Sequence, residues 1–500
     1  MTGPETAKKK DYLQWWILIT VIIGTFLGRL DQTIVNLALP KIINDFGITV
    51  TSAGWIATAY ILANAIFVPI WGKLGDTLGR KKVYIIGFIV FIIGSVLAGL
   101  AWNLSSMIVF RVIQAIAGSA DYPTAMAILA VTFKNGKERA QALGLWSASF
   151  AAASVFGPLI GGPLIDSFGW RSVFLINLPV GVIGLLMALK FIKESVSEQK
   201  TIKFDWWGAI TLGSTLSALV LVLEKGTNWG WLSTRSLLSY FVIILFSALF
   251  VAIEGKHPDP IVDFKFFKIP VFVNTLVNNF VVFMGMMGGV FLIPIFAQTF
   301  LGLDATQTGF LFMPMAAALM IASPIGGWLT GKIEPRYVIA ISTLIAALGL
   351  YFFSYLDPRS TAIDIIWPLS IMAFGLGFGM AQRTNIIASV VPTHEIGIAS
   401  SILALVRNIA GAFGIAIFGT ILTKITESNI LKIARNSTIH GANPLDFGKA
   451  FSLVVLKAQI SAYGSVFIIA STFLFIGAII ALWIKVSKED MRAAGEVVVE

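Results

Sequence analysis

The sequence contains no cysteine, only three histidines and little charge. Without cysteine the chain has no disulfides, no thiolate metal site and no cysteine nucleophile. The histidines, His257, His394 and His440, fall in expected loops without the HExxH spacing of a metal site, so we expect no bound metal. Only 12% of the residues are charged, about half the share found in soluble domains, which excludes disordered chains, coiled coils and ordinary soluble domains.

The sequence is dominated by long apolar segments, and 57% of its residues are hydrophobic. A transmembrane helix needs about 20 mostly apolar residues, and fourteen such segments follow one another along the chain. The expected spans are 15–38, 53–71, 83–101, 106–131, 141–165, 173–193, 206–224, 236–254, 270–297, 309–330, 338–356, 364–390, 398–422 and 462–485.

Lysine and arginine predict the orientation of these segments. With the N-terminus inside, the inside loops and tails hold 22 of the 36 basic residues, and the outside loops hold 10. Because short loops rich in lysine and arginine stay in the cytoplasm, we expect both termini there, in the plasma membrane and specifically the inner membrane of a bacterium. The net charge of +10 then reflects topology and does not indicate nucleic-acid binding.

The chain also shows signs of an internal duplication. The sequence GKL at 72–74 and the sequence GWL at 327–329 each open a short basic loop, and their offset is 255 residues. This pattern predicts an all-α membrane fold of two six-helix bundles with two inserted helices between them. The expected domains are a cytoplasmic N-terminus at 1–14, an N-terminal bundle at 15–193, an inserted helix pair with its loops at 194–268, a C-terminal bundle at 269–485 with a long outside loop at 423–461, and a cytoplasmic tail at 486–500.

The most specific motif is the basic loop GKLGDTLGRKK at 72–82. Its glycines, Gly72, Gly75 and Gly79, permit a tight turn, while Asp76 can pair with a cation or cap a helix and Arg80 marks the inside. With one extra residue, the segment resembles the loop G-x-L-x-D-x-x-G-R-[KR]-[KR] of the major facilitator superfamily.

Other segments resemble the fourteen-span drug:proton antiporters of that superfamily, the EmrB/QacA type. The segment LDQTIVNLALP at 30–40 resembles their LDxTIVNVALP, and RVIQAIAG at 111–118 resembles their R-x-x-Q-G. Gly157, Pro158, Gly161 and Gly162 belong to a copy of the antiporter motif G-x8-G-x3-G-P-x2-G-G in which Ala153 replaces a glycine. The segment 397–411, which contains Arg407, resembles their G-x-A-S-G…R-Q-x-G-G.

This resemblance implies a secondary exporter that works by alternating access without a cofactor, driven by the proton gradient. Its expected partners are lipophilic small molecules, protons and the lipid bilayer, with no nucleic acid, and a monomer is the expected state. An uptake symporter or a narrow-substrate or lipid transporter on the same fold remains an alternative, although the motif at 157–162 is associated with export. A polytopic enzyme would need a cluster of histidine, serine or carboxylate groups at one membrane face, and the sequence contains no such cluster.

Two aspartates inside spans are candidates for proton coupling. An ionisable residue inside a span costs several kcal/mol and therefore usually has a role or a partner. Asp31 and Arg111 lie at similar depths in spans 1 and 4, so they can pair, and Asp121 lies further along span 4. A carboxyl group removed from water holds its proton more readily, and a nearby arginine opposes this. We expect Asp31 and Asp121 to carry the proton or to bind a cationic group in its place; a static buried salt bridge is the alternative.

Polar and basic residues inside the spans predict a cavity. Thr25, Arg29, Gln32 and Asn36 share one face of span 1 and are expected to line it. Arg383 and Arg407 are further lining candidates, and Arg383 is expected to extend toward the inner surface. Because the arginines inside spans outnumber the aspartates, we expect a preference for anionic, zwitterionic or neutral lipophiles.

Overall fold

The computed structural model describes residues 4–133, 136–195, 205–258, 260–329, 332–391, 396–436 and 444–485, and within them the side chains of some helical residues are not described. This part of the chain is built from helices without a strand. Twelve of its helices are long and apolar enough to cross a membrane. The tail at 486–500 lies outside the described residues.

The first six expected spans form the N-terminal half of the molecule. Its helices are α1 (Pro4–Phe46), α2 (Val50–Leu78), α3 (Arg80–Gly99), α4 (Leu104–Gly118), α5 (Asp121–Thr132), α6 (Gly136–Phe168), α7 (Ser172–Leu175) and α8 (Asn177–Phe191). Hydrogen-bonding side chains begin several of them: Thr49 accepts from the Ser52 amide at α2, and Asn103 forms a capping box with Ser106 at α4.

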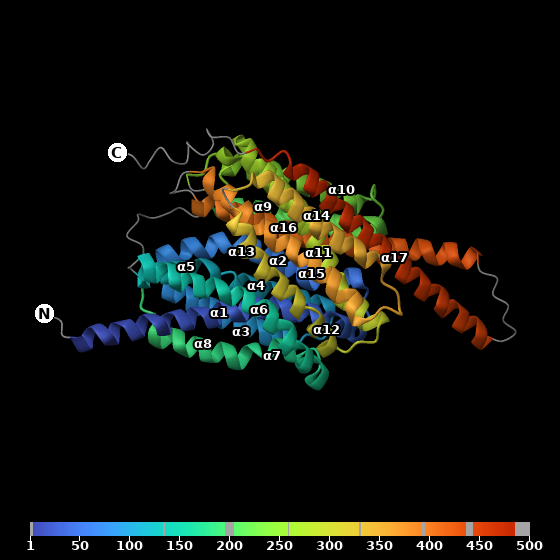
Figure 1. Cartoon of the computed structure of the whole chain (residues 1–500), viewed down its shortest axis with the longest axis horizontal. Helices are drawn as coiled ribbons and strands as arrows, with labels where there is room; N and C mark the ends of the chain where they lie inside the picture. Colours follow the sequence, from blue (N-terminus) through green and yellow to red (C-terminus); the bar gives the residue numbers. More distant parts are fainter. Residues whose placement is uncertain are drawn as a thin grey trace.

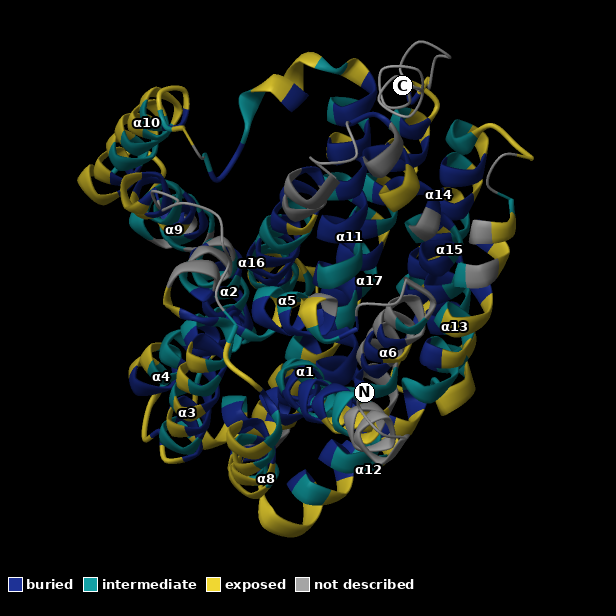
Figure 2. Cartoon of the chain, turned by 90° about the vertical axis from the view of Figure 1, so that its left-hand side faces the viewer, coloured by how far each residue is buried: buried dark blue, intermediate teal, exposed yellow. Residues whose placement is uncertain are grey.

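The last six expected spans form the C-terminal half, and an inserted pair connects the two halves. The pair is α9 (Trp206–Trp229) and α10 (Thr234–Glu254), followed by a 3-10 turn, η1 (Phe264–Lys268). The C-terminal half comprises α11 (Pro270–Phe300), α12 (Ala305–Leu311), α13 (Met313–Trp328), α14 (Pro335–Phe352), the 3-10 turn η2 (Phe353–Tyr355), α15 (Ala362–Ser389), α16 (Ile396–Asn436) and α17 (Pro444–Ala481). Seen along the bundle, α9 lies beside α2 and α16, and α10 lies outside α9 (Figure 2).

The fourth expected span, 106–131, is divided into α4 and α5. The helix is interrupted at Ser119 and Ala120, three residues before Pro123, whose ring nitrogen has no hydrogen to donate to the carbonyl of Ser119. As a result, Asp121 stands in the first turn of a new helix rather than in the middle of a continuous one.

The segment 423–461, expected to be a long outside loop, is helical at both ends. α16 continues to Asn436 and α17 begins at Pro444, and both extend beyond the rest of the bundle (Figure 1). The hydropathy pattern of the sequence detects only the parts of these two helices that are apolar enough to lie in a membrane.

Hydrogen bonds join the two halves at the end of the bundle that lies away from the basic start of α3, and we call this end the opposite end. There Gln298 Nε2 donates to the carbonyl of Leu37 (3.0 Å), and the hydroxyl oxygens of Thr51 and Thr423 lie 2.6 Å apart. The largest apolar cluster also joins the halves, with Ile34 and Phe291 among its members. The opposite end is therefore sealed by hydrogen bonds and apolar packing.

Candidate transport site

A buried ion pair lies in the N-terminal half. Arg111 of α4 places Nη1 2.5 Å from Oδ2 of Asp31 of α1, and these side chains are 2% and 0% exposed. Arg111 Nη1 also donates to Gln114 Oε1 (2.7 Å), and Gln114 Nε2 donates to Asp31 Oδ1 (2.9 Å). The depths expected from the sequence therefore correspond to a direct contact between Asp31 and Arg111.

Polar side chains from two further helices complete this network. Asn177 Nδ2, at the start of α8, donates to Asp31 Oδ1 (3.0 Å) and to Ser95 Oγ of α3 (2.7 Å). The guanidinium of Arg111 lies over the ring of Tyr60 of α2, 4.0 Å from its centroid, which is the geometry of a cation–π contact. The charge on Asp31 thus holds α1, α4 and α8 together, and Gln114 and Asn177 connect them to Ser95 of α3.

Asp121 lies in a second polar group, at the start of α5. Thr25 Oγ1 donates to Asp121 Oδ2 (2.6 Å) and accepts from Trp146 Nε1 (2.8 Å). The other carboxyl oxygen, Oδ1, is buried and has no hydrogen-bond partner among the described residues. Arg29 interacts electrostatically with Asp121. Two residues of the polar face expected on α1 therefore contact or attract this carboxyl: Thr25 by a hydrogen bond and Arg29 by its charge.

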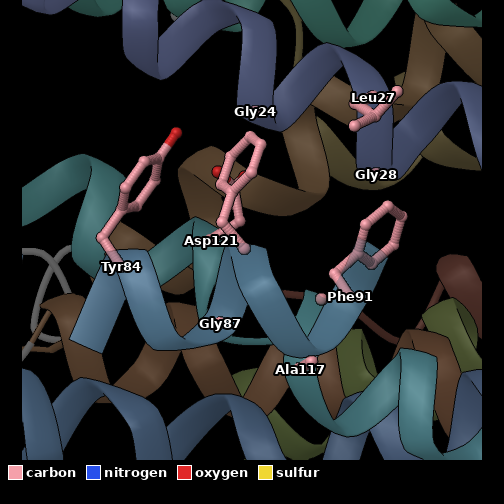
Figure 3. Close-up of a pocket in the computed structure, with 10 residues that line it drawn as sticks. Gly24, Leu27, Gly28, Tyr84, Gly87, Phe91, Ala117 and Asp121 are labelled. Atoms are coloured by element: carbon pink, nitrogen blue, oxygen red, sulfur yellow. The ribbon is translucent and has the colours of Figure 1, made fainter. Parts of the chain in front are cut away.

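Asp121 borders a small cavity between α1, α3 and the α4–α5 junction (Figure 3). The cavity measures about 20 Å³, which is room for about one water molecule. Glycines and apolar side chains form most of its wall: Gly24, Leu27, Gly28, Tyr84, Gly87, Phe88, Phe91, Ala117 and Gly118. A carboxyl oxygen that the described side chains leave without a partner, beside a water-sized space, is suited to bind a proton or a water molecule.

The remaining residues of the α1 stripe also lie partly inside the protein. Arg29 Nη1 donates to Gln32 Oε1 (3.2 Å), and Arg29, Gln32 and Asn36 are each half-buried. Arg407 of α16, on the other half, interacts electrostatically with Arg29. Its guanidinium lies over the ring of Phe283, 4.6 Å from the centroid. The structure therefore brings Arg29 and Arg407 to the same region between the halves.

Arg383 does not extend toward the inner surface as the sequence suggested. It is 1% exposed, and it donates from Nε to Asn278 Oδ1 and from Nη2 to Thr343 Oγ1, both at 2.7 Å. It lies more than one turn before the end of α15, and buried acceptors on α11 and α14 hold it inside. Asn278 of α11 therefore contacts a buried arginine in the C-terminal half, as Asp31 of α1 does in the N-terminal half.

The basic loop at 72–82 is shorter than expected. α2 continues to Leu78 and α3 begins at Arg80, so the turn consists of Gly79, whose φ of 105° favours glycine. Gly72, Gly75 and Asp76 consequently belong to the last turns of α2; the side chain of Asp76 lies outside the described part. Glu194, which follows α8, accepts from the amides of Lys81 (3.0 Å) and Lys82 (3.1 Å) and so caps α3.

The motif at 157–162 lies in α6, where small residues let three helices approach one another. A Cβ at Gly157 would meet Thr33 of α1, and one at Gly162 would meet the backbone of Thr306 of α12. Pro158 and Gly161 lie in the same buried stretch of α6. Near its end, Asp166 accepts from the Thr306 amide (2.9 Å) and hydroxyl (2.7 Å). This helix is therefore part of the seal at the opposite end.

Sequence reasoning did not identify several members of these networks. Ser95, Asn177 and Asn278 are isolated polar residues in apolar segments, and the resemblance of 111–118 to a family motif does not indicate the hydrogen bonds of Gln114. Their common signal is a neutral hydrogen-bonding side chain inside a span, which needs a partner in the absence of water. Glu194 gives no such signal, because it lies outside the spans.

Comparison with known proteins identifies the family. A family model described as Major Facilitator Superfamily matches residues 21–415. Multidrug resistance protein 3 of Bacillus subtilis (strain 168) is 32% identical over 432 residues, which are 85% of this chain and 83% of that protein. Multidrug transporter protein MdtP of the same organism is 34% identical over 408 residues, 81% of this chain and 75% of that protein.

A solved structure shares the fold. The inward-facing, unoccupied structure of a bacterial homologue of the human lysosomal transporter Spinster matches with a TM-score of 0.68 and 19% identity, over 95% of this chain and 99% of that one. Together these matches indicate a transporter rather than an enzyme. The chain belongs to the Major Facilitator Superfamily, and it is similar to members of that superfamily named as multidrug transporters.

Proposed function

We propose that the chain is a proton-coupled exporter of lipophilic small molecules. The observation that carries the proposal is the pair of aspartates in the N-terminal half: Asp31 in a buried ion pair, and Asp121 with a buried oxygen for which the described part of the chain supplies no hydrogen-bond partner. Both lie in segments where a charge is costly. The multidrug relatives support export of small molecules.

Protonation of Asp31 would rearrange its network. A proton on Asp31 cancels the charge that holds Arg111, Gln114 and Asn177 together, so α1, α4 and α8 become free to shift relative to one another. Loss of the proton restores the pair. Asp121 is the second proton carrier in this scheme, and the cavity beside it supplies a place for the water that delivers the proton.

Alternating access would then follow from movement of one half against the other. The seal at the opposite end, made by Asp166 with Thr306 and by Thr51 with Thr423, supports an inward-facing state. Asp76, Gly79 and Arg80 are proposed to stabilise the cytoplasmic gate when that end closes. The location that fits this scheme is a bacterial plasma membrane with both termini in the cytoplasm and the protein acting as a monomer.

Transport in liposomes tests the proposal. Purified protein is reconstituted into vesicles with an acidic lumen and a trapped pH dye, and ethidium, N-phenyl-1-naphthylamine or 8-anilinonaphthalene-1-sulfonate is added outside. We expect at least one probe to accelerate proton loss from the lumen, and we expect Asp31→Asn and Asp121→Asn to abolish this acceleration because neither releases a proton from the altered position.

A matched control uses another aspartate of α1. Asp45 pairs with Arg171 at 3.1 Å, but both side chains are almost half exposed, so Asp45→Asn should retain proton movement. Dye binding, followed by fluorescence, checks that the two inactive variants are folded. Full proton coupling in folded Asp31→Asn and Asp121→Asn would contradict the proposed carriers, and proton gain by the lumen on probe addition would indicate an uptake symporter.

A further inference from the structure

Two arginines from opposite halves lie in the same part of the interior. Arg29 of α1 and Arg407 of α16 interact electrostatically, and Tyr122 of α5 interacts with both. Both arginines are half-buried, and both lie more than two turns from the ends of their helices. Like charges that approach inside a protein repel each other strongly, and an anion between them would relieve that repulsion.

The charge around Arg407 favours an anion. Arg29 and Arg383 are charged groups that interact with Arg407, and both are cationic. Asp31 is already bonded to Arg111, and Asp121 is bonded to Thr25. Asp121 offsets part of the charge on Arg29, but among the described residues the three arginines outnumber this one carboxylate that acts on them.

The guanidinium of Arg407 has one N–H group, at Nε, that makes no hydrogen bond with the described residues. Nε of Arg407 is buried, although a buried donor of this kind normally has a partner. The face of its guanidinium lies against Phe283 at 4.6 Å, which fixes the plane of the group. A planar guanidinium whose Nε has no partner among the described residues matches an oxygen of a carboxylate, sulfonate or phosphate.

Apolar side chains adjoin this arginine. They form a cluster composed of Phe283, Met284 and Ala410, with Phe280, Met286, Met287, Phe413, Ile417 and Phe473 packed against it. Methionine and phenylalanine adapt to irregular aromatic or aliphatic shapes. The half-buried members of the cluster offer an apolar surface for the rest of a molecule whose charged group contacts Arg407.

We propose that Arg29 and Arg407 form a binding site for the anionic group of an amphipathic substrate, whose aromatic or aliphatic part packs on the Phe283 cluster. The inference rests on the proposed function and names its preferred substrate class, a lipophilic organic anion. Because the arginines belong to different halves, the anion connects the halves directly. Export of an anion in exchange for a proton moves net positive charge inward, so the membrane potential assists the exchange.

A matched pair of dyes tests the site. 8-Anilinonaphthalene-1-sulfonate is the probe, and N-phenyl-1-naphthylamine, which has the same rings without the sulfonate, is its neutral control. Kd values are measured by fluorescence with full-length protein in lipid nanodiscs, with empty nanodiscs subtracted. Loss of a hydrogen bond to a charged group lowers affinity about tenfold or more, so we expect Arg407→Gln and Arg29→Gln each to raise the Kd of the sulfonate by about that factor and to leave the neutral dye within about twofold.

Arg171→Gln is the control variant, because Arg171 is an exposed arginine that pairs with Asp45 away from the site. Competition on the unaltered protein does not depend on the folding of a variant: naphthalene-1-sulfonate should displace the bound dye at much lower concentration than naphthalene. Equal displacement by both, or sulfonate affinity unchanged in both arginine variants, would overturn the anion site. Either result concerns binding of the anionic group alone. Proton coupling is tested separately in liposomes, where the neutral and cationic probes can also drive proton movement.

Discussion

The buried pair of Asp31 and Arg111 allows a quantitative prediction. Asp31→Asn keeps the shape of the side chain but removes its charge, and it leaves Arg111 ionised with 2% of its side chain exposed. Removing one partner of a buried ion pair costs about 3–5 kcal/mol. Because Arg111 keeps Gln114 Oε1 at 2.7 Å and the Tyr60 ring at 4.0 Å, we expect the low end of that range, about 3 kcal/mol.

The partner substitution should cost less, and the two should not add. Arg111→Gln leaves Asp31 with hydrogen bonds from Gln114 and Asn177. The double variant Asp31→Asn/Arg111→Gln has no unpaired charge, so its loss of stability should be smaller than the sum of the single losses by about 2 kcal/mol, within the range measured for contacting residues.

The assay is a double-mutant cycle on unfolding in mixed detergent–SDS micelles, followed by tryptophan fluorescence. The exposed pair of Asp45 and Arg171 provides the comparison cycle, for which we expect a coupling below about 1 kcal/mol. Strictly additive effects of Asp31→Asn and Arg111→Gln would refute the reasoning, because they would mean that neither charge depends on the other.

Three further predictions concern the gates and the cavity. Because the chain has no cysteine and the hydroxyls of Thr51 and Thr423 lie 2.6 Å apart, Thr51→Cys/Thr423→Cys should form a disulfide that stops transport until a reductant is added; free cycling of the oxidised protein would contradict the seal. Glu194→Gln should weaken the cap of α3 by about 1 kcal/mol, seen as faster hydrogen exchange of the first amides of α3, whereas unchanged exchange would exclude the cap. Gly28→Leu adds a side chain where a Cβ meets no atom within 4 Å, in the wall of the cavity, and should slow proton movement in liposomes several-fold more than Gly448→Leu, a control in similarly open space.

The order of the spans could be predicted from the sequence because each span is governed by a local property. About twenty apolar residues suffice to define a span, as in 270–297, where α11 covers Pro270–Phe300. The same property does not show where a helix breaks or continues. The division at Ser119 follows from Pro123, and the extension of α16 to Asn436 involves residues too polar for a hydropathy count.

Part of the site could also be predicted. The depth of a charged residue follows from its distance to the ends of its span. This distance places Asp31 and Arg111 at similar depths, and the two side chains are in contact in the structure. The surroundings of Arg383 could not be predicted in this way, because they depend on which helices lie beside α15. Asn278 and Thr343 come from distant parts of the chain, and only the packed bundle shows that they hold the guanidinium inside.

The measurement that tests the central claim most directly is whether a substrate gradient alone moves protons. Vesicles containing the protein and a trapped pH dye are prepared with equal pH on both sides and a clamped potential, and a transported probe is added outside. Exchange of substrate for protons predicts that the lumen becomes alkaline as the probe enters, and that Asp121→Asn abolishes the change. Acidification of the lumen, or probe entry without any pH change, would contradict proton-coupled export.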